Sequence, residues 1–438
     1  MSVGTPLRIG LAGLGTVGRG VVRLLRCEAG ALTAAAGRQL ELTRVASRTP
    51  RPEVDLGGAA FSTDLATLPA ANDVDVVVEA IGGEDAAKTL FSAAVAAKKH
   101  VVTANKALIA VHGNELMRSA REAGVFIGIE AAVAGGIPII SALTRGLAAN
   151  RIEWLAGIIN GTSNYVLTAM SEEGQDFRAA LREAQRLGYA EADPTFDVEG
   201  IDAAHKLAIL AGLAFGTPFD FDSVYVEGIS DVEAEDVAYA RELGYRIKHL
   251  GIARLNANGV EARVHPCLTP ESALIGKVDG VMNAVQVKGH AVGSTLYVGP
   301  GAGAGPTASS IVSDLIELAR GAAGWISAPP AKNAPGASPL GDLTCAHYLN
   351  VPAEDQPGVF ADVAQTLSRH GISIEGVIQQ PQAIRGKRGA EWVPIVILTD
   401  VVAERDAERA VADIEKLAGV TGKVRRIRVA DLANSSGE

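Results

Sequence analysis

The sequence predicts an α/β protein of three units: a doubly wound parallel sheet, an α+β domain in the middle, and a small ferredoxin-like domain at the C-terminus. Three observations predict this fold class. Strand-like and helix-like patterns alternate along residues 1–130, as in parallel sheets with helices on both faces. A glycine fingerprint follows the first of these strands. Residues 343–432 follow a βαββαβ order, which is the split βαβ sandwich.

The first strand and the first helix are predicted at residues 7–13 and 16–26, where an apolar run is followed by helical spacing. Between them Gly13, Gly15 and Gly18 form a GxGxxG fingerprint. The first glycine makes the tight turn, the second lets the backbone approach a pyrophosphate, and the third lets the helix pack on the strand.

The start of this helix adds an anion site. The backbone N–H groups of Thr16 and Val17 are free to bind a phosphate, because the first turn of a helix leaves its donors unpaired. The context therefore predicts a Rossmann-type NAD(P)-binding domain over residues 1–135. Residues 300–325, a second glycine-rich stretch that leads into a helix, are expected to complete it.

The second predicted strand, residues 40–47, indicates which dinucleotide is bound. NAD sites usually carry an acid at the end of this strand, where it holds the ribose 2′-hydroxyl. Here the strand ends in Ser47, Arg48 and, three residues later, Arg51, and a guanidinium at this place suits a 2′-phosphate. NADP(H) is therefore favoured over NAD(H), although Arg48 also fits an ordinary surface arginine.

Three further strands are predicted at residues 74–83, 100–106 and 125–133. Because open parallel sheets bind ligands at the carboxyl ends of their strands, Lys106 is expected to point into the cleft. Glu130 opens the segment EAAVAGGIP, which combines a carboxylate with a small-residue turn whose carbonyls suit a hard cation. Taken alone, this segment is better explained as an ordinary turn.

The middle domain is predicted over residues 136–299. It begins with a strand and three helices, at residues 151–159, 160–170, 176–188 and 198–215. Asp202 and Lys206 lie four apart on one face of the last helix, either as a surface ion pair or as part of a site. The acidic loop before that helix carries Glu191, Asp193 and Asp197, which could bind the amino group of a polar substrate.

Residues 326–342 are rich in Ala, Pro and Gly and are predicted to be a linker. The βαββαβ unit follows at residues 343–432. Two basic stretches, RGKRG at 385–389 and KVRRIRV at 423–429, are interpreted as solvated surface.

Composition narrows the class of protein. The 438 residues, 48% of them hydrophobic, suit a globular chain of two to four domains. The formal charge of −10 argues against nucleic acid or an anionic membrane as a partner. Three scattered cysteines and the lack of a signal-peptide pattern predict a reducing, cytoplasmic location. No run approaches the ~18 apolar residues of a membrane span, and no His/Cys cluster in the sequence suggests zinc.

Together these motifs resemble the homoserine dehydrogenase family, in the long form that ends in an ACT domain. The resemblance covers essentially the whole chain, and it rests on GLGTVG, TANKAL, EAAVAGGIPII, NGTSNY, LGYAEADPTFDVEGIDAAHK and GPGAGAGPTASS. It implies NAD(P)H-dependent reduction of L-aspartate 4-semialdehyde to L-homoserine, a step of threonine and methionine biosynthesis.

The resemblance also implies roles for single residues. Lys206 would be the catalytic lysine, with Asp202 as its partner. Lys106 would be the second lysine, close to both cofactor and substrate. Glu191 would bind the substrate, with Gly188 beside it.

A cation site and a further cofactor contact are implied in the same way. Glu130 and the carbonyls of Val133, Gly135 and Ile137 would bind a monovalent cation, Na⁺ or K⁺. Gly303 would be the loop glycine that contacts the cofactor.

The family resemblance further implies a homodimer or homotetramer joined through the middle domain, and an ACT domain that responds to L-threonine. Two alternatives stay open, a non-catalytic sensor and another semialdehyde or amino-acid dehydrogenase. The complete set of Lys106, Glu191, Asp202 and Lys206 argues against the sensor. The second class often needs a nucleophilic cysteine, and no cysteine lies in a cleft-facing motif.

Overall fold

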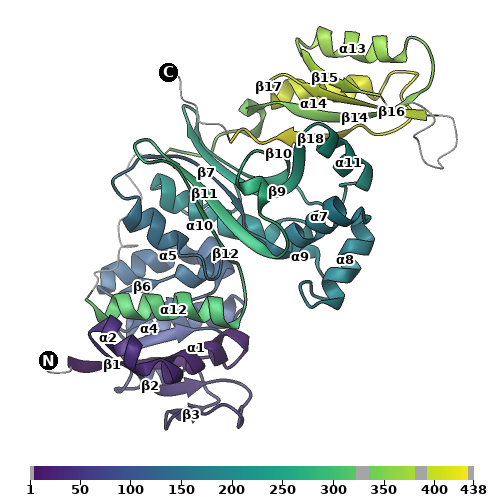
Figure 1. Ribbon diagram of the computed structural model, residues 1–438. Helices are drawn as coiled ribbons and strands as arrows, with labels where there is room; N and C mark the ends of the chain where they lie inside the picture. Colours follow the sequence, from purple (N-terminus) through teal and green to yellow (C-terminus); the bar gives the residue numbers. More distant parts are fainter. Residues whose placement is uncertain (1–3, 322–334, 380–391, 433–438) are drawn as a thin grey trace.

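The computed structural model describes residues 4–321, 335–379 and 392–432, which form three units one above the other (Figure 1). Most of the predicted linker at 326–342 and the whole basic stretch at 385–389 lie outside the described residues. Within the described ranges, no helix combines the length and the apolar character that crossing a membrane requires.

The first unit is the predicted doubly wound sheet. Its strands are all parallel and lie in the order β3-β2-β1-β4-β5-β6. They are β1 (Gly4–Ala12), β2 (Arg38–Ala46), β3 (Ala60–Ser62), β4 (Val76–Glu79), β5 (His100–Thr103) and β6 (Ile127–Gly128). The helices around it are α1 (Thr16–Cys27), α2 (Ala29–Ala36), α3 (Thr67–Ala70), α4 (Asp85–Ala96) and α5 (Lys106–Ala123).

The core of this unit also takes in a helix from much later in the chain, α12 (Ala304–Ala319). Val76, Val77 and Val78 of β4 are fully buried, because helices cover both faces of a parallel sheet. In Figure 1 the green α12 lies against the purple α1. The approach is close: a Cβ on Gly20 would lie 2.4 Å from the carbonyl oxygen of Ala304.

Two predicted boundaries are wrong. The strand predicted over 125–133 is only the two residues of β6, and a 3₁₀ turn, Glu130–Ala132, follows it. The helix predicted over 198–215 is in fact α10 (Ile201–Phe215). It begins late because Gly200 has a φ of +83°, a left-handed conformation that interrupts the helical path.

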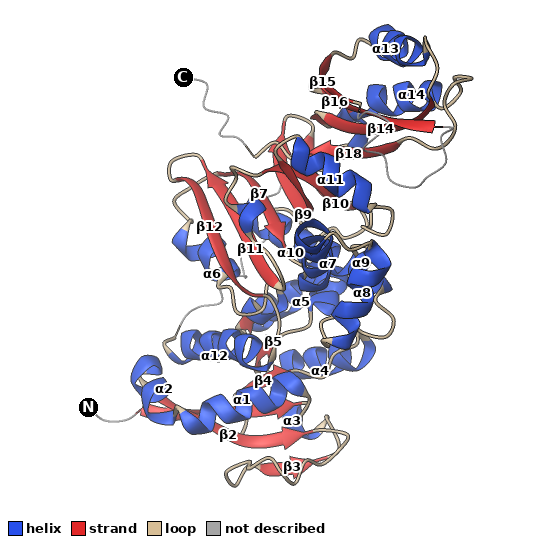
Figure 2. Ribbon diagram, turned by 45° about the vertical axis from the view of Figure 1, so that its right-hand side comes forward, coloured by secondary structure: helices blue, strands red, loops and turns tan. Residues whose placement is uncertain are grey.

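The middle unit is a mixed sheet with helices on one side (Figure 2). Its strands are β7 (Ile152–Ile158), β8 (Tyr225–Val226), β9 (Tyr245–Asn256), β10 (Gly259–Pro270), β11 (Met282–Gly289) and β12 (Gly293–Pro300). Its helices, besides α10, are α6 (Ile139–Ser141), α7 (Gly161–Glu173), α8 (Phe177–Arg186), α9 (Thr195–Val198) and α11 (Ala234–Glu242). Leu207 and Ile209 of α10 are fully buried in the core, where α10 packs on β9 and β10.

The C-terminal unit confirms the predicted βαββαβ order. The six elements are β14 (His347–Glu354), α13 (Val359–Arg369), β15 (Ile374–Ile378), β16 (Trp392–Thr399), α14 (Glu404–Ile414) and β18 (Arg425–Val429). Two short strands, β13 (Thr344–Cys345) and β17 (Val402–Ala403), form a separate ribbon. The unit is not separate from the middle one, because β18 pairs in parallel with β10, and one sheet runs through both.

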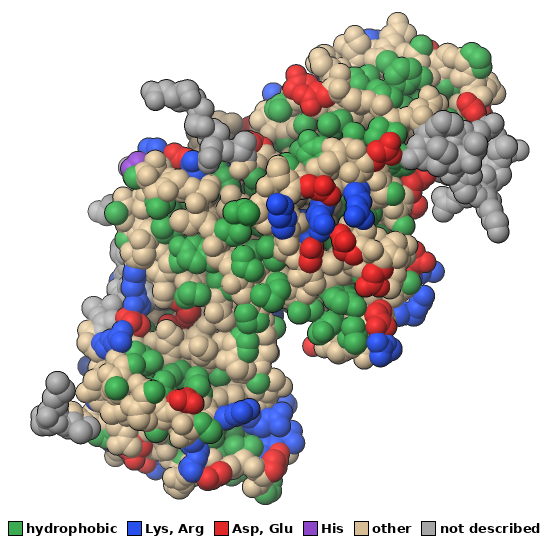
Figure 3. Space-filling view, in the orientation of Figure 1, with side chains coloured by type: hydrophobic (Ala, Val, Ile, Leu, Met, Phe, Trp, Pro, Cys, Tyr) green, Lys and Arg blue, Asp and Glu red, His purple; other side chains and the backbone are tan. Residues whose placement is uncertain are grey.

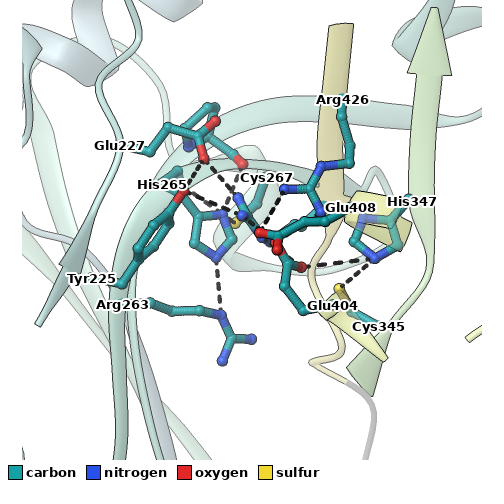
Figure 4. Close-up of polar contacts among 12 residues, drawn as sticks. Tyr225, Glu227, Arg263, His265, Cys267, Cys345, His347, Glu404, Glu408 and Arg426 are labelled. Carbon is teal, nitrogen blue, oxygen red and sulfur yellow. Dashed lines mark hydrogen bonds and ion pairs between the residues drawn. The ribbon is translucent and has the colours of Figure 1, made fainter. Parts of the chain in front are cut away.

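A buried polar cluster, the junction cluster, lies where these two units meet (Figure 4). The side chain of Arg428 on β18 is 2% exposed, and its guanidinium bonds to Glu404 at 2.5 Å and to Glu227 of the middle unit at 2.7 Å. A second guanidinium, that of Arg426, reaches Glu404 at 2.7 Å. The interpretation of residues 423–429 as solvated surface is therefore wrong. The alternating basic pattern belongs to β18, an interior strand between β10 and β14, and its arginines lie buried or half-buried at the interface of the two units.

Candidate active site

The fingerprint turn has the geometry that its glycines require. Gly13 has a φ of +99°, and a Cβ there would lie 2.5 Å from the carbonyl oxygen of Ala80. A Cβ on Gly18 would lie 2.0 Å from the carbonyl oxygen of Gly13, so the helix could not approach the strand with any other residue. By contrast, nothing lies within 4 Å of a Cβ on Gly15. The turn is thus closed on the protein side and open where a pyrophosphate would approach.

The other predicted cofactor residues lie around this edge of the sheet. Thr16 and Val17 are the first residues of α1, whose N-cap, Gly15, has no side chain to occupy their N–H groups. Ser47 and Arg48 directly follow β2, and Arg48 is exposed, without a hydrogen bond or ion pair to any described residue. These observations fit a dinucleotide with a phosphate near the end of β2.

Gly303 lies in the loop before α12, with a φ of +119°. Its neighbours in that loop pack on the segment EAAVAGGIP: a Cβ on Gly135 would lie 2.4 Å from the carbonyl oxygen of Gly301. The two small-residue loops therefore form one wall, and bulkier residues would separate them.

Lys106 is the first residue of α5 and lies across from the middle unit. The N-cap of that helix is Asn105, whose side chain accepts a hydrogen bond from the N–H of Leu108. The cap fixes the direction of the first turn, and with it the position of Lys106. Figure 3 shows a hollow on the right between the first unit and the part of the middle unit that carries α8 and α9.

The predicted catalytic residues meet in one cluster, the cleft cluster. The Nζ atom of Lys206 lies 2.7 Å from Asp202 Oδ2, and the Nζ atom of Lys106 lies 3.0 Å from Asp202 Oδ1. Lys206 also donates to the carbonyl of Ile159, at 2.7 Å. Asp202 is 6% exposed, Lys206 12% and Lys106 34%. Asp202 is therefore the one direct ion-pair partner that the two ammonium groups share among the described residues.

The charge state of Asp202 follows from this arrangement. Burial alone would favour the neutral acid. The charges of Lys206 and Lys106 outweigh burial, and hydrogen bonds from Lys206 and Asn160 add to them, so the pKa of Asp202 lies below its usual range. The group is therefore a carboxylate and cannot donate a proton to the substrate.

Sequence reasoning missed Asn160 as a member of the cluster. Its amide nitrogen donates to both Asp202 Oδ2 and Asp197 Oδ1, each at 2.8 Å. Its amide oxygen caps α7 by accepting from the N–H of Ser163. The signal was present, because an asparagine between a strand and a helix is a typical N-cap, and Asn160 lies two residues after the end of β7.

The predicted substrate-binding residues do not all lie together. Asp197 belongs to the cluster, but its carboxylate already accepts hydrogen bonds from Asn160 and from Thr162, at 3.0 Å. Gly188 has a φ of +77° in the turn after α8. Glu191 is exposed, and its carboxylate has no partner among the described residues.

The predicted cation site is built from oxygen donors, but its carboxylate is partly occupied. Glu130 is 1% exposed, and it accepts hydrogen bonds from the N–H groups of Ile140 and Ser141 at 2.9 Å and from the hydroxyl of Ser141. Burial raises the pKa of Glu130 against these bonds. A carboxylate offers about four lone-pair positions, so one stays available to a cation.

The carbonyls of the proposed cation site are also partly engaged. Gly135 accepts from the hydroxyl of Ser310 at 2.6 Å, and Ile137 accepts from the N–H of Ile139 at 2.7 Å. Val133 is buried beside them. A carbonyl oxygen has two lone pairs, so a donor set of this kind fits a hard monovalent cation.

A second group of metal-ligand types lies in the junction cluster. Cys345, His347 and Glu404 place one ligand atom each within 4.8 Å of one another, and all three are buried. Glu404 is already compensated by Arg428 and Arg426, which leaves no charge for a metal to balance. We therefore regard this group as structural.

A dinucleotide turn and an amine-rich cluster at the same edge of a doubly wound sheet define an NAD(P)-dependent oxidoreductase. The family model described as "Homoserine dehydrogenase, NAD binding domain" matches residues 13–130, the one described as "Homoserine dehydrogenase" matches 138–316, and the one described as "ACT domain" matches 347–419.

Relatives and solved structures agree along the whole chain. A homoserine dehydrogenase of Pseudomonas aeruginosa is 50% identical over 98% of this chain and 99% of its own. The crystal structure of a homoserine dehydrogenase from Thiobacillus denitrificans has a TM-score of 0.92 and 49% identity, and covers 98% of this chain and 99% of its own. An archaeal homoserine dehydrogenase, solved in complex with NADPH, matches with a TM-score of 0.60 and 26% identity, over 72% of this chain and 97% of its own.

The chain belongs to the homoserine dehydrogenase family, in the form with a C-terminal ACT domain. It is an NAD(P)-dependent oxidoreductase, which confirms the resemblance inferred from its motifs and excludes the two alternatives kept beside it.

Proposed function

We propose that the cleft reduces the aldehyde of L-aspartate 4-semialdehyde to the primary alcohol of L-homoserine, with NADPH as the preferred reductant. The observation that carries this proposal is the pairing geometry: two ammonium groups share the single carboxylate of Asp202 at the cleft. A carbonyl oxygen that gains negative charge during reduction is stabilised by such donors.

Lys206 is the proposed proton donor to that oxygen. An ammonium group has three N–H donors, and two of those on Lys206 are directed to Asp202 and to the carbonyl of Ile159. The third is left for the substrate. The buried carboxylate of Asp202 holds the amine of Lys206 in place, and the buried amide of Asn160 in turn holds Asp202.

The bound dinucleotide supplies the hydride. Arg48 is the proposed partner of the 2′-phosphate, because it is exposed beyond β2 and is free of other described contacts. The archaeal relative whose solved structure holds NADPH supports this preference. NAD(H) would lack the phosphate and lose only that interaction.

Glu191 is the proposed partner of the substrate's ammonium group. Its carboxylate is exposed and uncommitted among the described residues, whereas Asp197 already accepts from Asn160 and Thr162. We assign Asp197 to holding the loop, with Gly188 giving the turn before it the left-handed geometry it needs.

Glu130 and the carbonyls of Val133, Gly135 and Ile137 are proposed to bind Na⁺ or K⁺. The support is a donor set made of oxygen atoms around a buried carboxylate. Such an ion would hold the segment EAAVAGGIP against the loop at Gly303, on one wall of the cofactor site.

Feedback inhibition by L-threonine through the ACT domain is proposed as the regulation. A short run of contacts supports it. Arg428 of the ACT domain bonds to Glu227, and the N–H of Ile229 bonds to the carbonyl of Val198 at 2.9 Å. Gly200 and the start of α10 lie two residues further on. An effector that moved this junction would need a coupling of roughly 1–3 kcal/mol.

Assembly as a homodimer or homotetramer is proposed through the middle unit. Leu274, Val292 and Val298 of that unit are 67%, 49% and 49% exposed, and β12 is an edge strand.

L-homoserine would serve threonine and methionine biosynthesis in the cytoplasm, where reducing conditions suit the three free cysteines.

A steady-state assay with aspartate semialdehyde tests the proposal, with NADPH and NADH in parallel. Lys206→Ala should lower kcat by roughly 10²–10⁴, because it removes the proton donor. Cofactor binding should stay nearly unchanged. Wild-type kcat in folded Lys206→Ala would refute the role of this lysine. Indifference of the full-length enzyme to millimolar threonine would refute the regulation alone.

A further inference from the structure

A stack of aromatic rings runs from the interior of the middle unit to Lys106. The ring of His205 lies between those of Phe221 and Phe196, with centroids 4.2 Å and 5.5 Å away. The ammonium of Lys106 lies 5.8 Å from the centroid of the Phe196 ring. Phe196 is 43% exposed, an unusual position for a phenylalanine next to a buried helix.

Lys106 is held across the cleft by two contacts of different kinds. One is the ion pair with Asp202, a carboxylate that Lys206 shares. The other is the face of the Phe196 ring. Both come from the middle unit, whereas Lys106 belongs to the NAD-binding unit. They therefore fix an ammonium group on a side chain that is still one-third exposed.

His205 supports this ring without competing for charge. It is 5% exposed, and its Nδ1 atom has no hydrogen-bond partner among the described residues. Burial, reinforced by the charge of Lys106, lowers the pKa of His205, so the ring is neutral. A protonated imidazole here would bring a second positive charge toward the ammonium of Lys106.

We propose that Phe196 is a positioning residue for Lys106, with its ring face holding the ammonium in line with Asp202, and that His205 supports the ring from behind. The inference rests on the proposed function, in which Lys106 is one of the two ammonium groups that stabilise the negative charge forming on the carbonyl oxygen. An aromatic face attracts an ammonium group through its quadrupole, which an aliphatic side chain of similar volume does not. The contribution is therefore separable from packing.

The test uses the full-length enzyme and a double-mutant cycle. Phe196→Leu keeps an apolar group but removes the ring face, and it should lower kcat roughly two- to fivefold, the effect of a cation–π contact at a partly exposed site. Phe196→Tyr keeps the ring face and should restore kcat. With Lys106→Met as the background, Phe196→Leu should cause no further loss. Thermal unfolding of each variant serves as the folding control.

Equal losses from Phe196→Leu in both backgrounds would overturn the inference, because the ring would then act through packing alone. A loss in Phe196→Tyr as large as that in Phe196→Leu would overturn it too. Wild-type kcat in Lys106→Met would refute the proposed role of Lys106, and the inference with it. The first two outcomes leave the proposed function standing, so the two failures are distinguishable.

Discussion

The cleft cluster and the junction cluster are both built from paired cationic and carboxylate side chains, but they serve different purposes. In the cleft, Lys106 and Lys206 share one carboxylate, that of Asp202, as their direct ion-pair partner. In the junction, the guanidinium of Arg428 lies between the carboxylates of Glu404 and Glu227, and Arg426 also pairs with Glu404, so that two guanidinium groups face two carboxylates. In a buried cluster where every charged group has a direct partner, no charged group remains available to a ligand. In a cluster at a cleft where two ammonium groups share one carboxylate, N–H donors remain available to a ligand.

The difference also concerns exposure. Arg428 and Glu404 are 2% and 0% exposed, so water cannot replace a lost partner. Lys106 is 34% exposed, and water or substrate can reach it. We therefore expect changes in the cleft cluster to affect turnover and changes in the junction cluster to affect stability.

The largest expected effect is on turnover. Asp202→Asn keeps the size of the side chain but removes the charge that holds both lysines, and kcat should fall by roughly 10²-fold, within the range of positioned acid–base groups. Asp193→Asn is the matched control, because Asp193 lies in the exposed loop before α9 and, among the described residues, its carboxylate bonds to Thr195 alone. If both variants lost turnover equally, the claim that turnover depends on the carboxylate of Asp202 in particular would be disproved.

The next effect is on stability. Arg428→Met should lower the free energy of unfolding by about 3 kcal/mol, the lower end for breaking a buried pair, because Arg426 still compensates Glu404. Arg405→Met is the control: Arg405 pairs with Asp342 at 2.8 Å on the surface, and its loss should cost at most about 1 kcal/mol. Denaturant unfolding measures both. Similar losses in the two variants would contradict the structural role of the junction cluster.

A smaller effect concerns the cofactor. Arg48→Ala should raise the KM for NADPH about ten- to a hundredfold, the value of a charged hydrogen bond, and leave that for NADH nearly unchanged. Arg51→Ala, three residues further along the same exposed loop, should change neither. Parallel assays with the two cofactors decide this, and equal effects of Arg48→Ala on both would show that Arg48 does not bind the phosphate.

A further effect is a dependence of stability on pH. Burial lowers the pKa of His347 to about 3. Between that value and its unfolded pKa of about 6.5, the unfolded chain binds a proton that the folded chain does not. Stability should therefore fall as pH falls through this window, by about 1.4 kcal/mol per pH unit for each such histidine.

Unfolding of His347→Gln at several pH values measures this contribution. The variant removes a titrating group from the junction cluster, so its stability should depend less steeply on pH between 6 and 4 than that of the wild type. An unchanged slope would show that His347 does not contribute.

The sequence predicted the cleft cluster better than the junction cluster, and the reason is locality. Asp202 and Lys206 are four residues apart on one helix, and Lys106 follows a strand whose carboxyl end points to the site. The position of each of these residues follows from its own segment of sequence together with one rule, either helical spacing or the location of ligand sites at the carboxyl ends of parallel strands. The glycine fingerprint is local in the same way.

The junction cluster joins segments that no local pattern connects. Arg428 and Glu227 are about 200 positions apart, and they meet only because β18 pairs with β10. The alternation of residues 423–429 correctly predicted a strand, but not which face would be covered. Asn160 and Phe196 were missed for a similar reason, since their importance depends on partners from other elements.

The most direct test of the account compares Lys206→Met with Arg428→Met, each measured for both kcat and the free energy of unfolding. The account predicts a crossed pattern: Lys206→Met loses at least about a hundredfold in kcat and less stability than Arg428→Met, because Lys106 still pairs with Asp202, whereas Arg428→Met loses more stability and, while still folded, keeps kcat within a few-fold. If both variants lost activity and stability in the same proportion, the division between the two clusters would be contradicted.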